Sequence, residues 1–422
     1  MKKIIIIIIS LAVLIFIGYF GYHYLLGFKN TEFVVSQETT FDNSVNHVNG
    51  TWWGFNQSKI ARIDEYVFTY YVDNSTQIGD VANANNPNQM VFIMIDNSGK
   101  ITEFDSKPTS RPGNVVADNA RQRIYYFTLE PTSSEDNGYL CKLVMYVYQL
   151  EAGEAVFHRQ EVVIDNQGIY PETINIRLAV TIDKTGNIGV TYSIPNPSYI
   201  FSMYVHTYDI LTETWEEKSV LIDGLNHPNF YPELIMKDIN HFLVVAVQDY
   251  CYGGDCYYQY TRYFIYNEGQ WSYDYLADYR DLEIAKERAN LTAHSEVYIG
   301  SDNQYHVLTI SRLSDEDNEA VVNHYILNES SNTFSKTSFS GKYNHIRMVT
   351  VNDIDYFVAV DNKHLMILNN NYEIIHQQDT TKSVYIYVCS DNADFFDLLV
   401  TTGNSEDIAV VDNVYYRIEK ID

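Results

Sequence analysis

The chain has 422 residues, of which 46% are hydrophobic and 14% aromatic, so it holds enough apolar material for a large folded core. Acidic residues outnumber basic ones, 55 against 28, and the formal net charge is −27. A charge of this sign and size repels nucleic acid and anionic lipid surfaces. No nucleic-acid partner is therefore expected.

The first predicted element is an apolar segment from Ile4 to Phe28 that contains no Lys, Arg, Asp or Glu. It is long enough to cross a bilayer core of roughly 30 Å. Lys2 and Lys3 precede it, and positive charge at this end favours a cytoplasmic N-terminus with the remaining chain outside the cell. A cleaved secretory signal is the alternative, but the run exceeds the ~7 to 15 residues of a signal core and lacks a small-x-small cleavage site.

These features divide the chain into three parts: a transmembrane signal anchor (1–30), a stalk or ring-closing strand (31–50) and an extracellular domain (51–422). The protein is predicted to be a single-pass protein of the cell membrane. Its N-terminal helix is the expected membrane contact, and its C-terminal domain is expected to be extracellular.

From Trp52 to the C-terminus, four short aromatic and β-branched runs separated by turn residues return about every 50 residues. Asp, Asn and Gly occupy the predicted hairpin turns, for example at 118–121, 183–186 and 301–304, because they tolerate tight-turn dihedrals. Seven units can be counted. The predicted fold is an all-β, seven-bladed β-propeller following the N-terminal transmembrane helix, in which residues 32–39 either pair with the last unit or form an extended stalk.

The third run of several units ends in an aromatic residue that is expected to meet another aromatic residue across the following turn. These positions alternate with polar residues, which is typical of half-buried strands. The expected pairs are Tyr148 with Phe157, Tyr208 with Trp215, Phe264 with Trp271, and Tyr325 with Phe334.

Cys251 and Cys256 bracket Tyr-Gly-Gly-Asp between two aromatic runs, so a hairpin brings them within bridging distance. An extracellular site permits oxidation, and a disulfide is predicted, with two free thiols as the alternative. No metal site is expected, because zinc requires a second pair of Cys or His that the spacing does not supply. Cys141 and Cys389 lie in apolar runs and are expected to be buried.

The segment 49–58, Asn-Gly-Thr-Trp-Trp-Gly-Phe-Asn-Gln-Ser, followed by residues 63–73, resembles the opening of the BNR-repeat-containing, sialidase-like propeller proteins. Segments 111–118 and 293–299 resemble blade starts of the same superfamily. Some members of that superfamily are glycosidases, others with seven blades are polysaccharide lyases, and many have no assigned activity. The resemblance implies a propeller and leaves its activity open.

The chain departs from the catalytic members of that superfamily. Sialidases have repeated Ser-x-Asp-x-Gly-x-Thr-Trp turns, which this sequence lacks, and an Arg-Ile-Pro motif, where Arg62-Ile63 is followed here by Asp64. The related lyases have a histidine at the start of the second blade, whereas this chain has Ser110-Arg111-Pro112. These departures argue against a sialidase and disfavour catalysis.

Polar and aromatic residues at the unit starts are the candidate ligand-binding residues, because the inner strands of a propeller open into its central funnel. A lyase needs His or Tyr as acid or base, and Arg or Asn to stabilise an enolate-like charge. The candidates include these types, but no catalytic residue follows from their spacing. They are Arg111, Asn114, His227, Asn229, Tyr231, His294 and His345.

The sequence thus predicts a membrane-anchored extracellular propeller that binds a ligand, with carbohydrate the leading class and no cofactor. Two alternatives remain open. The first is a polysaccharide lyase or glycoside hydrolase acting on an acidic polysaccharide, and the second is a protein-interaction platform.

The uncleaved anchor can be tested directly. Because Lys2 and Lys3 precede an apolar run without a cleavage site, the mature protein should begin near Met1 and remain in the membrane fraction after a carbonate wash. N-terminal sequencing of the purified protein checks this. A soluble form that begins near residue 30 would contradict it.

Overall fold

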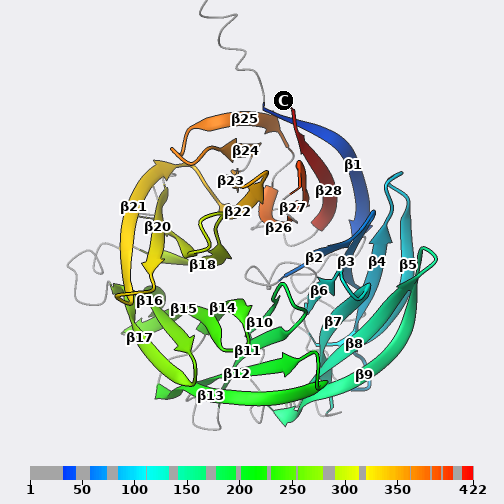
Figure 1. Ribbon diagram of the computed structural model, residues 1–422, viewed down its shortest axis with the longest axis horizontal. Coiled ribbons are helices and arrows are strands. Elements are labelled where there is room, and N and C mark those ends of the chain that lie inside the picture. The colour runs from blue at the N-terminus through cyan, green and yellow to red at the C-terminus, as the bar shows by residue number, and fades with distance from the viewer. Residues whose placement is uncertain are drawn as a thin grey trace, which may run out of the picture.

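The computed structural model describes residues 32–43, 58–73, 84–110, 112–132, 141–167, 177–195, 201–225, 230–252, 255–278, 290–312, 320–361, 363–380, 383–390, 393–402 and 411–421. Within these residues, 28 strands form seven four-stranded sheets. The sheets stand around a common axis, with the first strand of each sheet innermost (Figure 1). This arrangement confirms the predicted all-β, seven-bladed propeller.

Every strand ladder is antiparallel, and the strands follow one another from the axis outward in chain order in six of the seven blades. Blade 1 contains β2 (Ile60–Ile63), β3 (Tyr66–Asp73), β4 (Asn88–Ile95) and β5 (Ile101–Thr109). Blade 2 contains β6 (Asn114–Asp118), β7 (Arg123–Pro131), β8 (Cys141–Glu151) and β9 (Glu154–Gln167). Blade 3 contains β10 (Arg177–Ile182), β11 (Ile188–Pro195), β12 (Phe201–Asp209) and β13 (Thr214–Leu225).

Blade 4 contains β14 (Phe230–Asp238), β15 (His241–Tyr252), β16 (Asp255–Asn267) and β17 (Gln270–Asp278). Blade 5 contains β18 (Asn290–Ile299), β19 (Tyr305–Arg312), β20 (Ala320–Asn328) and β21 (Thr333–Gly341). Blade 6 contains β22 (His345–Val351), β23 (Ile354–Val360), β24 (His364–Leu368) and β25 (Ile374–Asp379). Blade 7 contains β26 (Ser383–Cys389), β27 (Phe395–Thr402), β28 (Val411–Lys420) and, from the other end of the chain, β1 (Phe33–Asn43).

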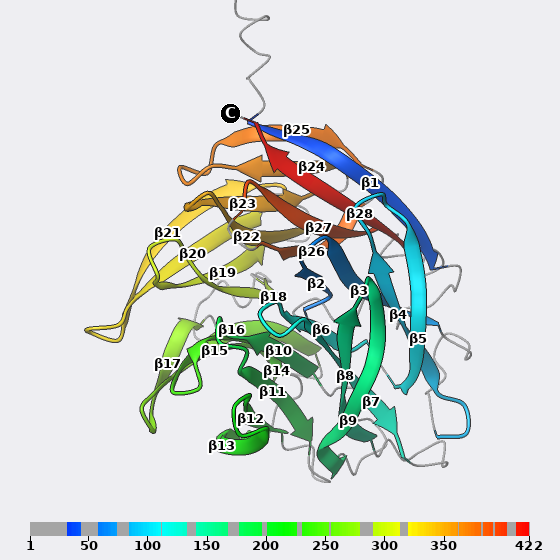
Figure 2. The same cartoon turned by 45° about the vertical axis from the view of Figure 1, so that its right-hand side comes forward.

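Blade 7 closes the ring because its outermost strand comes from the N-terminal side of the chain. β1 pairs with β28 from Phe33 opposite Lys420 to Asn43 opposite Val411. The first described residue continues this contact, since the Ile421 N–H donates to the Glu32 carbonyl at 2.7 Å. The segment predicted as a stalk or a ring-closing strand is thus a strand of the propeller over residues 33–43 (Figure 2).

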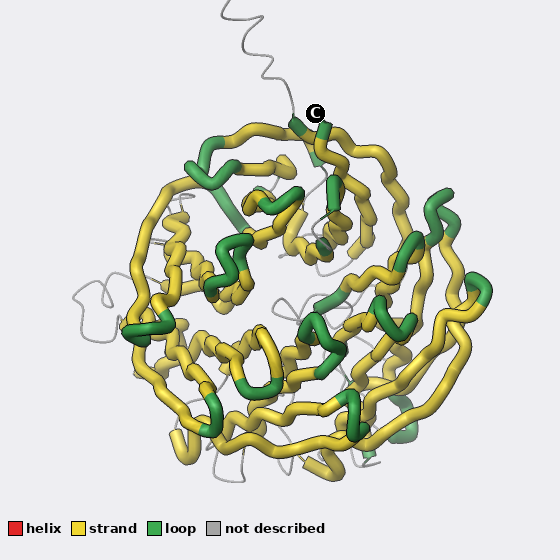
Figure 3. Tube along the Cα trace, in the orientation of Figure 1, coloured by secondary structure: helices red, strands yellow, loops and turns green. Residues whose placement is uncertain are grey.

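The alternation of the strands gives the ring two different faces. The turns from first to second and from third to fourth strands lie on one face, here called the turn face, and several are as short as two residues, such as Asp64-Glu65 and Asn352-Asp353 (Figure 3). Each inner strand begins on the opposite face, the blade-start face. β1 begins on the turn face, because it runs antiparallel to β28 in the position of a fourth strand. The described chain therefore enters the propeller on the turn face, at Glu32.

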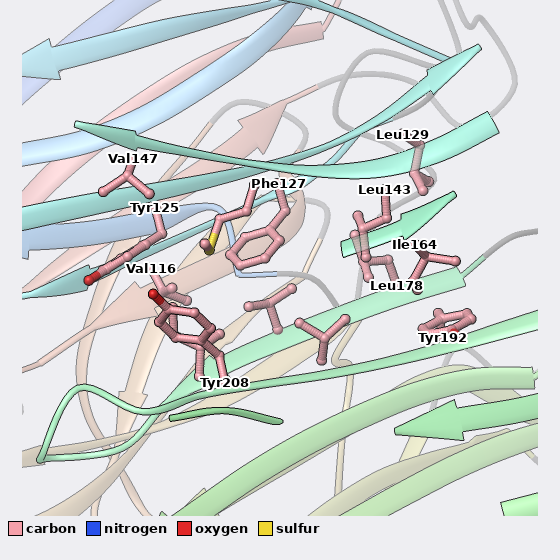
Figure 4. Packing of buried hydrophobic residues seen from close by; sticks show 14 of the residues in the cluster. Val116, Tyr125, Phe127, Leu129, Leu143, Val147, Ile164, Leu178, Tyr192 and Tyr208 are labelled. Carbon is pink, nitrogen blue, oxygen red and sulfur yellow. The ribbon is translucent and has the colours of Figure 1, made fainter. Parts of the chain in front are cut away.

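The apolar core is divided among the interfaces between blades instead of forming one central mass. Seven buried clusters occur, and each combines residues of two neighbouring blades. The cluster between blades 2 and 3 includes Phe127, Val147 and Tyr208 (Figure 4). Because every blade needs both neighbours to bury its two faces, an open ring would expose the interface between blades 7 and 1 to water.

A buried ion pair fastens that interface. Arg62 of β2 pairs through Nε and Nη2 with the carboxylate of Asp397 on β27, with the Nη2 to Oδ1 distance 2.7 Å. The Tyr415 hydroxyl on β28 donates to the same Oδ1 atom at 2.7 Å. These bonds satisfy the charged groups where water is excluded, and they tie the first blade to the last.

Two details differ from the sequence-based expectations. The rings of Tyr148 and Phe157, of Tyr208 and Trp215, and of Tyr325 and Phe334 meet across their turns, as predicted. Trp271, however, lies opposite Tyr266 instead of Phe264, because the turn is tighter than assumed and the register moves by two residues. Cys141 is buried as expected, whereas Cys389 is only half-buried.

Among the described residues, no helix has the length and apolar character required to cross a membrane. Residues 1–31, on which the predicted anchor falls, lie outside the described part of the chain, so the anchor stays a prediction.

The buried ion pair between Arg62 of blade 1 and Asp397 of blade 7 leads to a prediction about stability. Asp397→Asn should lower the free energy of unfolding by about 3 kcal/mol or more, because it leaves the buried Arg62 guanidinium without a countercharge. Denaturant titration monitored by tryptophan fluorescence measures the change. The matched control is Glu216→Gln, which breaks an ion pair with Lys218 on a 68% exposed side chain and should cost less than about 1 kcal/mol. An equal decrease in the free energy of unfolding in the two variants would show that the Arg62–Asp397 ion pair has no special role in joining blades 1 and 7.

Candidate functional site

Charged side chains from several blades meet at the axis of the ring. The central residue is Arg347, the third residue of β22, an inner strand that is buried along its whole length. Its Nη1 atom lies 3.0 Å from Oε1 of Glu233 on β14 and 2.9 Å from Oε2 of Glu296 on β18. Its Nε atom donates to the Ile386 carbonyl of β26 at 3.3 Å. One guanidinium thus joins four consecutive blades, whose inner strands surround the axis in Figure 1.

The two carboxyl groups have different surroundings. Glu296 also accepts a hydrogen bond from the Met348 N–H at 3.3 Å, and 5% of its side-chain surface is exposed. We call Arg347, Glu233 and Glu296 the triad. Glu233 is its most exposed member, with 12% of its side-chain surface exposed, and the Glu233 Oε2 atom accepts no hydrogen bond from the described residues. Glu296 Oε2 likewise accepts no hydrogen bond from the described residues, although it lies 2.9 Å from Arg347 Nη1. The triad therefore contains two buried carboxylate oxygens whose hydrogen-bonding capacity is not used by the described residues.

Burial changes the acid–base properties of these groups. It raises the pKa of Glu296 to about 7, although the nearby Arg347 charge opposes the shift. Burial likewise raises the pKa of Glu233 well above its ordinary value, again against Arg347, and the neighbouring Glu296 adds to the increase. Burial disfavours the Arg347 charge, but the two carboxylates outweigh it and raise the pKa of Arg347, which stays protonated.

A second cation lies beside this triad. Lys59, immediately before β2, is fully buried, and its ammonium group lies 5.0 Å from the ring centroid of Tyr387 and 5.8 Å from that of Tyr70. Burial lowers the pKa of Lys59 well below its ordinary value, and the positive charge of Arg347 lowers it further. The guanidinium carbon of Arg347 is 5.7 Å from the same Tyr387 ring. We call Lys59, Glu233, Glu296, Arg347 and Tyr387 the axial cluster.

Three of the residues predicted from the sequence lie on inner strands, and two of them are close in the chain to members of this cluster. Tyr231 is buried two residues before Glu233, and His345 is buried two residues before Arg347. His345 Nδ1 accepts a hydrogen bond from the Ile386 N–H at 3.2 Å. Asn114 begins β6, and its Oδ1 atom accepts one from the Ser58 N–H at 2.8 Å. Asn114 and His345 thus connect neighbouring blades, and their binding role stays a prediction.

The other predicted residues cannot be placed in the site. Arg111, His227 and Asn229 lie outside the described residues, and so does the side chain of His294, whose backbone belongs to β18. Cys251 lies opposite Cys256 in the ladder between β15 and β16, as the predicted hairpin requires. Their side chains are also outside the described set, so the disulfide stays a prediction.

The sequence analysis missed the axial cluster. Its signal is a charged residue within an otherwise apolar first strand, as in His-Ile-Arg-Met-Val at 345–349 and Tyr-Pro-Glu-Leu-Ile at 231–235. Within its own unit, each charged residue is a single departure from an apolar strand pattern. Only the ring brings charges from units far apart in the chain to a common axis.

No protein-family model matches this chain, and no curated protein sequence matches it. Similar folds occur among solved structures, including the polysaccharide lyase Uly1, with TM-score 0.55, 9% identity, and coverage of 87% of this chain and 90% of that one. The BP39L lectin from Burkholderia pseudomallei has TM-score 0.52, 9% identity, and coverage of 84% and 94%. A Trypanosoma rangeli sialidase has TM-score 0.43, 10% identity, and coverage of 86% and 53%. At these identities the likeness extends to the propeller fold alone.

The raised pKa of Glu296 predicts a pH dependence of stability. The folded protein binds this proton more tightly than the unfolded chain, so its contribution is present below pH 4.5 and is lost as the pH rises toward 7. The free energy of unfolding should therefore fall across this window relative to that of Glu296→Gln, which has no proton to lose. Denaturant titrations of both proteins at pH 5, 6, 7 and 8 measure the difference. A constant difference would contradict the assignment.

Proposed function

We propose that the protein binds carbohydrate at the axis of its propeller, through the axial cluster and the neighbouring inner-strand residues. The observation that carries this proposal is the incompletely satisfied ion triad. The Arg347 guanidinium fixes the carboxyl groups of Glu233 and Glu296, while Glu233 retains an oxygen without a hydrogen bond among the described residues. A sugar hydroxyl is a donor of the size and polarity that this oxygen accepts.

The chemistry of the cluster suits a polyhydroxylated ligand. Neighbouring sugar hydroxyls each donate and accept, so they pair with planar groups whose donors and acceptors are fixed in space. Inner strands of four blades hold the triad, and the side chains are already ordered before a ligand arrives, which lowers the entropic cost of binding. Tyr387 on β26 adds apolar ring surface beside Arg347, and Tyr385 on the same strand packs against the ring of His345.

The topology also supports an orientation for a membrane-anchored form. β1 begins on the turn face, so a membrane helix within residues 1–31 would attach there. The inner strands begin on the other face, and Asn114, Tyr231 and His345 lie in their first two positions. In this arrangement the blade-start face points away from the bilayer and meets extracellular glycans.

A second candidate function is hydrolysis or elimination on an acidic polysaccharide. The observation in its favour is that two carboxyl groups share one Arg347 nitrogen, and the pKa of Glu296 is raised to about 7. A carboxyl group that titrates near neutral pH serves as a general acid or base. Catalysis would separate this candidate from simple binding: glycosidic cleavage releases reducing ends, and elimination produces unsaturated ends that absorb in the ultraviolet.

A glycan array probed with the full-length chain in detergent tests the proposed function. Glu233→Gln keeps the size of the side chain but removes the charge and one acceptor, so capture of the bound glycan should fall about tenfold or more. Glu329→Gln, on a 45% exposed side chain of the turn face, is the matched control and should bind as the wild type does.

Two outcomes would contradict carbohydrate binding at the axis. The first is a wild-type protein that captures no glycan. The second is a Glu233→Gln variant that keeps its thermal unfolding midpoint and binds its glycan with wild-type affinity. Release of reducing or unsaturated ends by the wild type would establish the enzymatic alternative instead.

A further inference from the structure

The outer rim of blade 4 carries a pair of exposed tyrosines. Tyr273 and Tyr275 lie on β17, the outermost strand of this blade, and their exposed fractions are 63% and 40%. Residues two apart in a strand point to the same face, so both rings project from one side of the sheet. Asp274, between them, belongs to the opposite face and accepts the Tyr275 N–H at 2.8 Å.

An arginine lies against both rings. Arg262 on β16 is paired with Tyr275 in the ladder, and its guanidinium carbon is 5.4 Å from the Tyr275 ring centroid and 5.7 Å from that of Tyr273. The same group is 5.1 Å from the ring of Phe264, a fully buried residue. Cation–π attraction thus fixes the guanidinium beside two tyrosines that stay accessible to solvent. We call Arg262, Tyr273 and Tyr275 the rim cluster.

Arg262 has no carboxylate partner among the described residues. Every other arginine with a described side chain lies within 4.0 Å of an Asp or Glu oxygen. The Nε atom of Arg262 is buried and donates no hydrogen bond to a described residue. In a chain of net charge −27, acidic side chains are abundant, so an arginine left without one retains its full capacity for an external anion.

The surrounding packing keeps this cluster in place. The ring of Tyr260, a buried residue of β16, meets Tyr275 edge-on at a centroid distance of 5.7 Å. Farther along the same two strands, Tyr266 and Trp271 pack into the apolar interface with blade 3. The sheet that carries the rim cluster is therefore anchored on one side, and little side-chain freedom is lost when a ligand binds.

We propose that the rim cluster binds an acidic sugar residue, a pyranose with one carboxylate. The guanidinium pairs with the carboxylate, and the tyrosine rings accept the C–H face of the sugar. A neutral sugar would leave the Arg262 charge unpaired. A densely charged polyanion would meet the repulsion of the whole acidic protein, so the fitting ligand is a glycan in which uronate residues are separated by neutral sugars.

This site is distinct from the axial cluster, where the arginine is already neutralised by Glu233 and Glu296. The two sites therefore differ in the sugars they favour. The axial site needs hydroxyl groups, and the rim site needs a carboxylate.

Calorimetry on the full-length chain in detergent tests the rim site. The probes are a glucuronate-containing oligosaccharide, with a neutral sugar between successive uronates, and its carboxyl-reduced counterpart. The acidic probe should bind at least about tenfold more tightly than the reduced one. Arg262→Gln should remove this preference, and Tyr273→Ala with Tyr275→Ala should weaken the acidic probe by about tenfold or more. Binding of the acidic probe should weaken at higher salt.

Two control variants separate the rim site from other effects. Phe157→Ala removes a 49% exposed aromatic residue from β9, another outermost strand, and should leave binding of the acidic probe unchanged. Glu233→Gln should also leave it unchanged, because it alters only the axial cluster. The thermal unfolding midpoint of each variant is measured first, and binding is compared at a temperature at which all variants are folded.

The proposal is overturned if the wild type binds both probes equally, or binds neither. It is also overturned if the double tyrosine variant retains wild-type affinity for the acidic probe. Loss of the carboxylate preference in Glu233→Gln but not in Arg262→Gln would move the acidic-sugar site to the axis.

Discussion

The structure depends on burying the charged guanidinium group of Arg347 away from water at the centre of the ring. Arg347 occupies a buried inner strand, where an unpaired charge would cost several kcal/mol. Glu233 and Glu296 supply the countercharge from two other blades, and the Ile386 carbonyl supplies an acceptor from a third. These directional contacts specify how the four blades meet, which apolar packing alone leaves adjustable.

The abundance of tyrosine, 37 residues, follows from the architecture. A blade interface is mostly apolar, but backbone carbonyl groups of the neighbouring blade lie within reach of its side chains. Tyr70 of blade 1 donates its hydroxyl to the Gly113 carbonyl at 2.5 Å, and Tyr126 of blade 2 donates to the Thr69 carbonyl at 3.0 Å. The ring of such a tyrosine thus packs in the interface, and its hydroxyl donates a hydrogen bond to a backbone carbonyl of the neighbouring blade.

The ring places its two charge clusters in different environments. At the axis, strands from several blades converge, so opposite charges from distant parts of the chain pair with each other. At the rim, the outermost strands diverge and each blade has few neighbours. Arg262 has aromatic rings beside it instead of a described carboxylate, and two of these rings belong to exposed tyrosines. This difference in geometry explains why the arginine of the axial cluster is paired with carboxylates, whereas the arginine of the rim cluster has no carboxylate partner among the described residues.

The sequence by itself determined the strands, the turns and the number of blades, because alternating apolar residues and turn residues are local signals. It also located Asn114, Tyr231 and His345 on inner strands, since each begins a repeat. The tertiary structure decided the exchange of β1 into the last blade, where the sequence left a stalk equally open. It also decided the two-residue shift that places Trp271 opposite Tyr266, and the meeting of Glu233, Glu296 and Arg347. These features depend on ring closure and on the tightness of individual turns, which bring together residues whose separation in the chain hides their proximity.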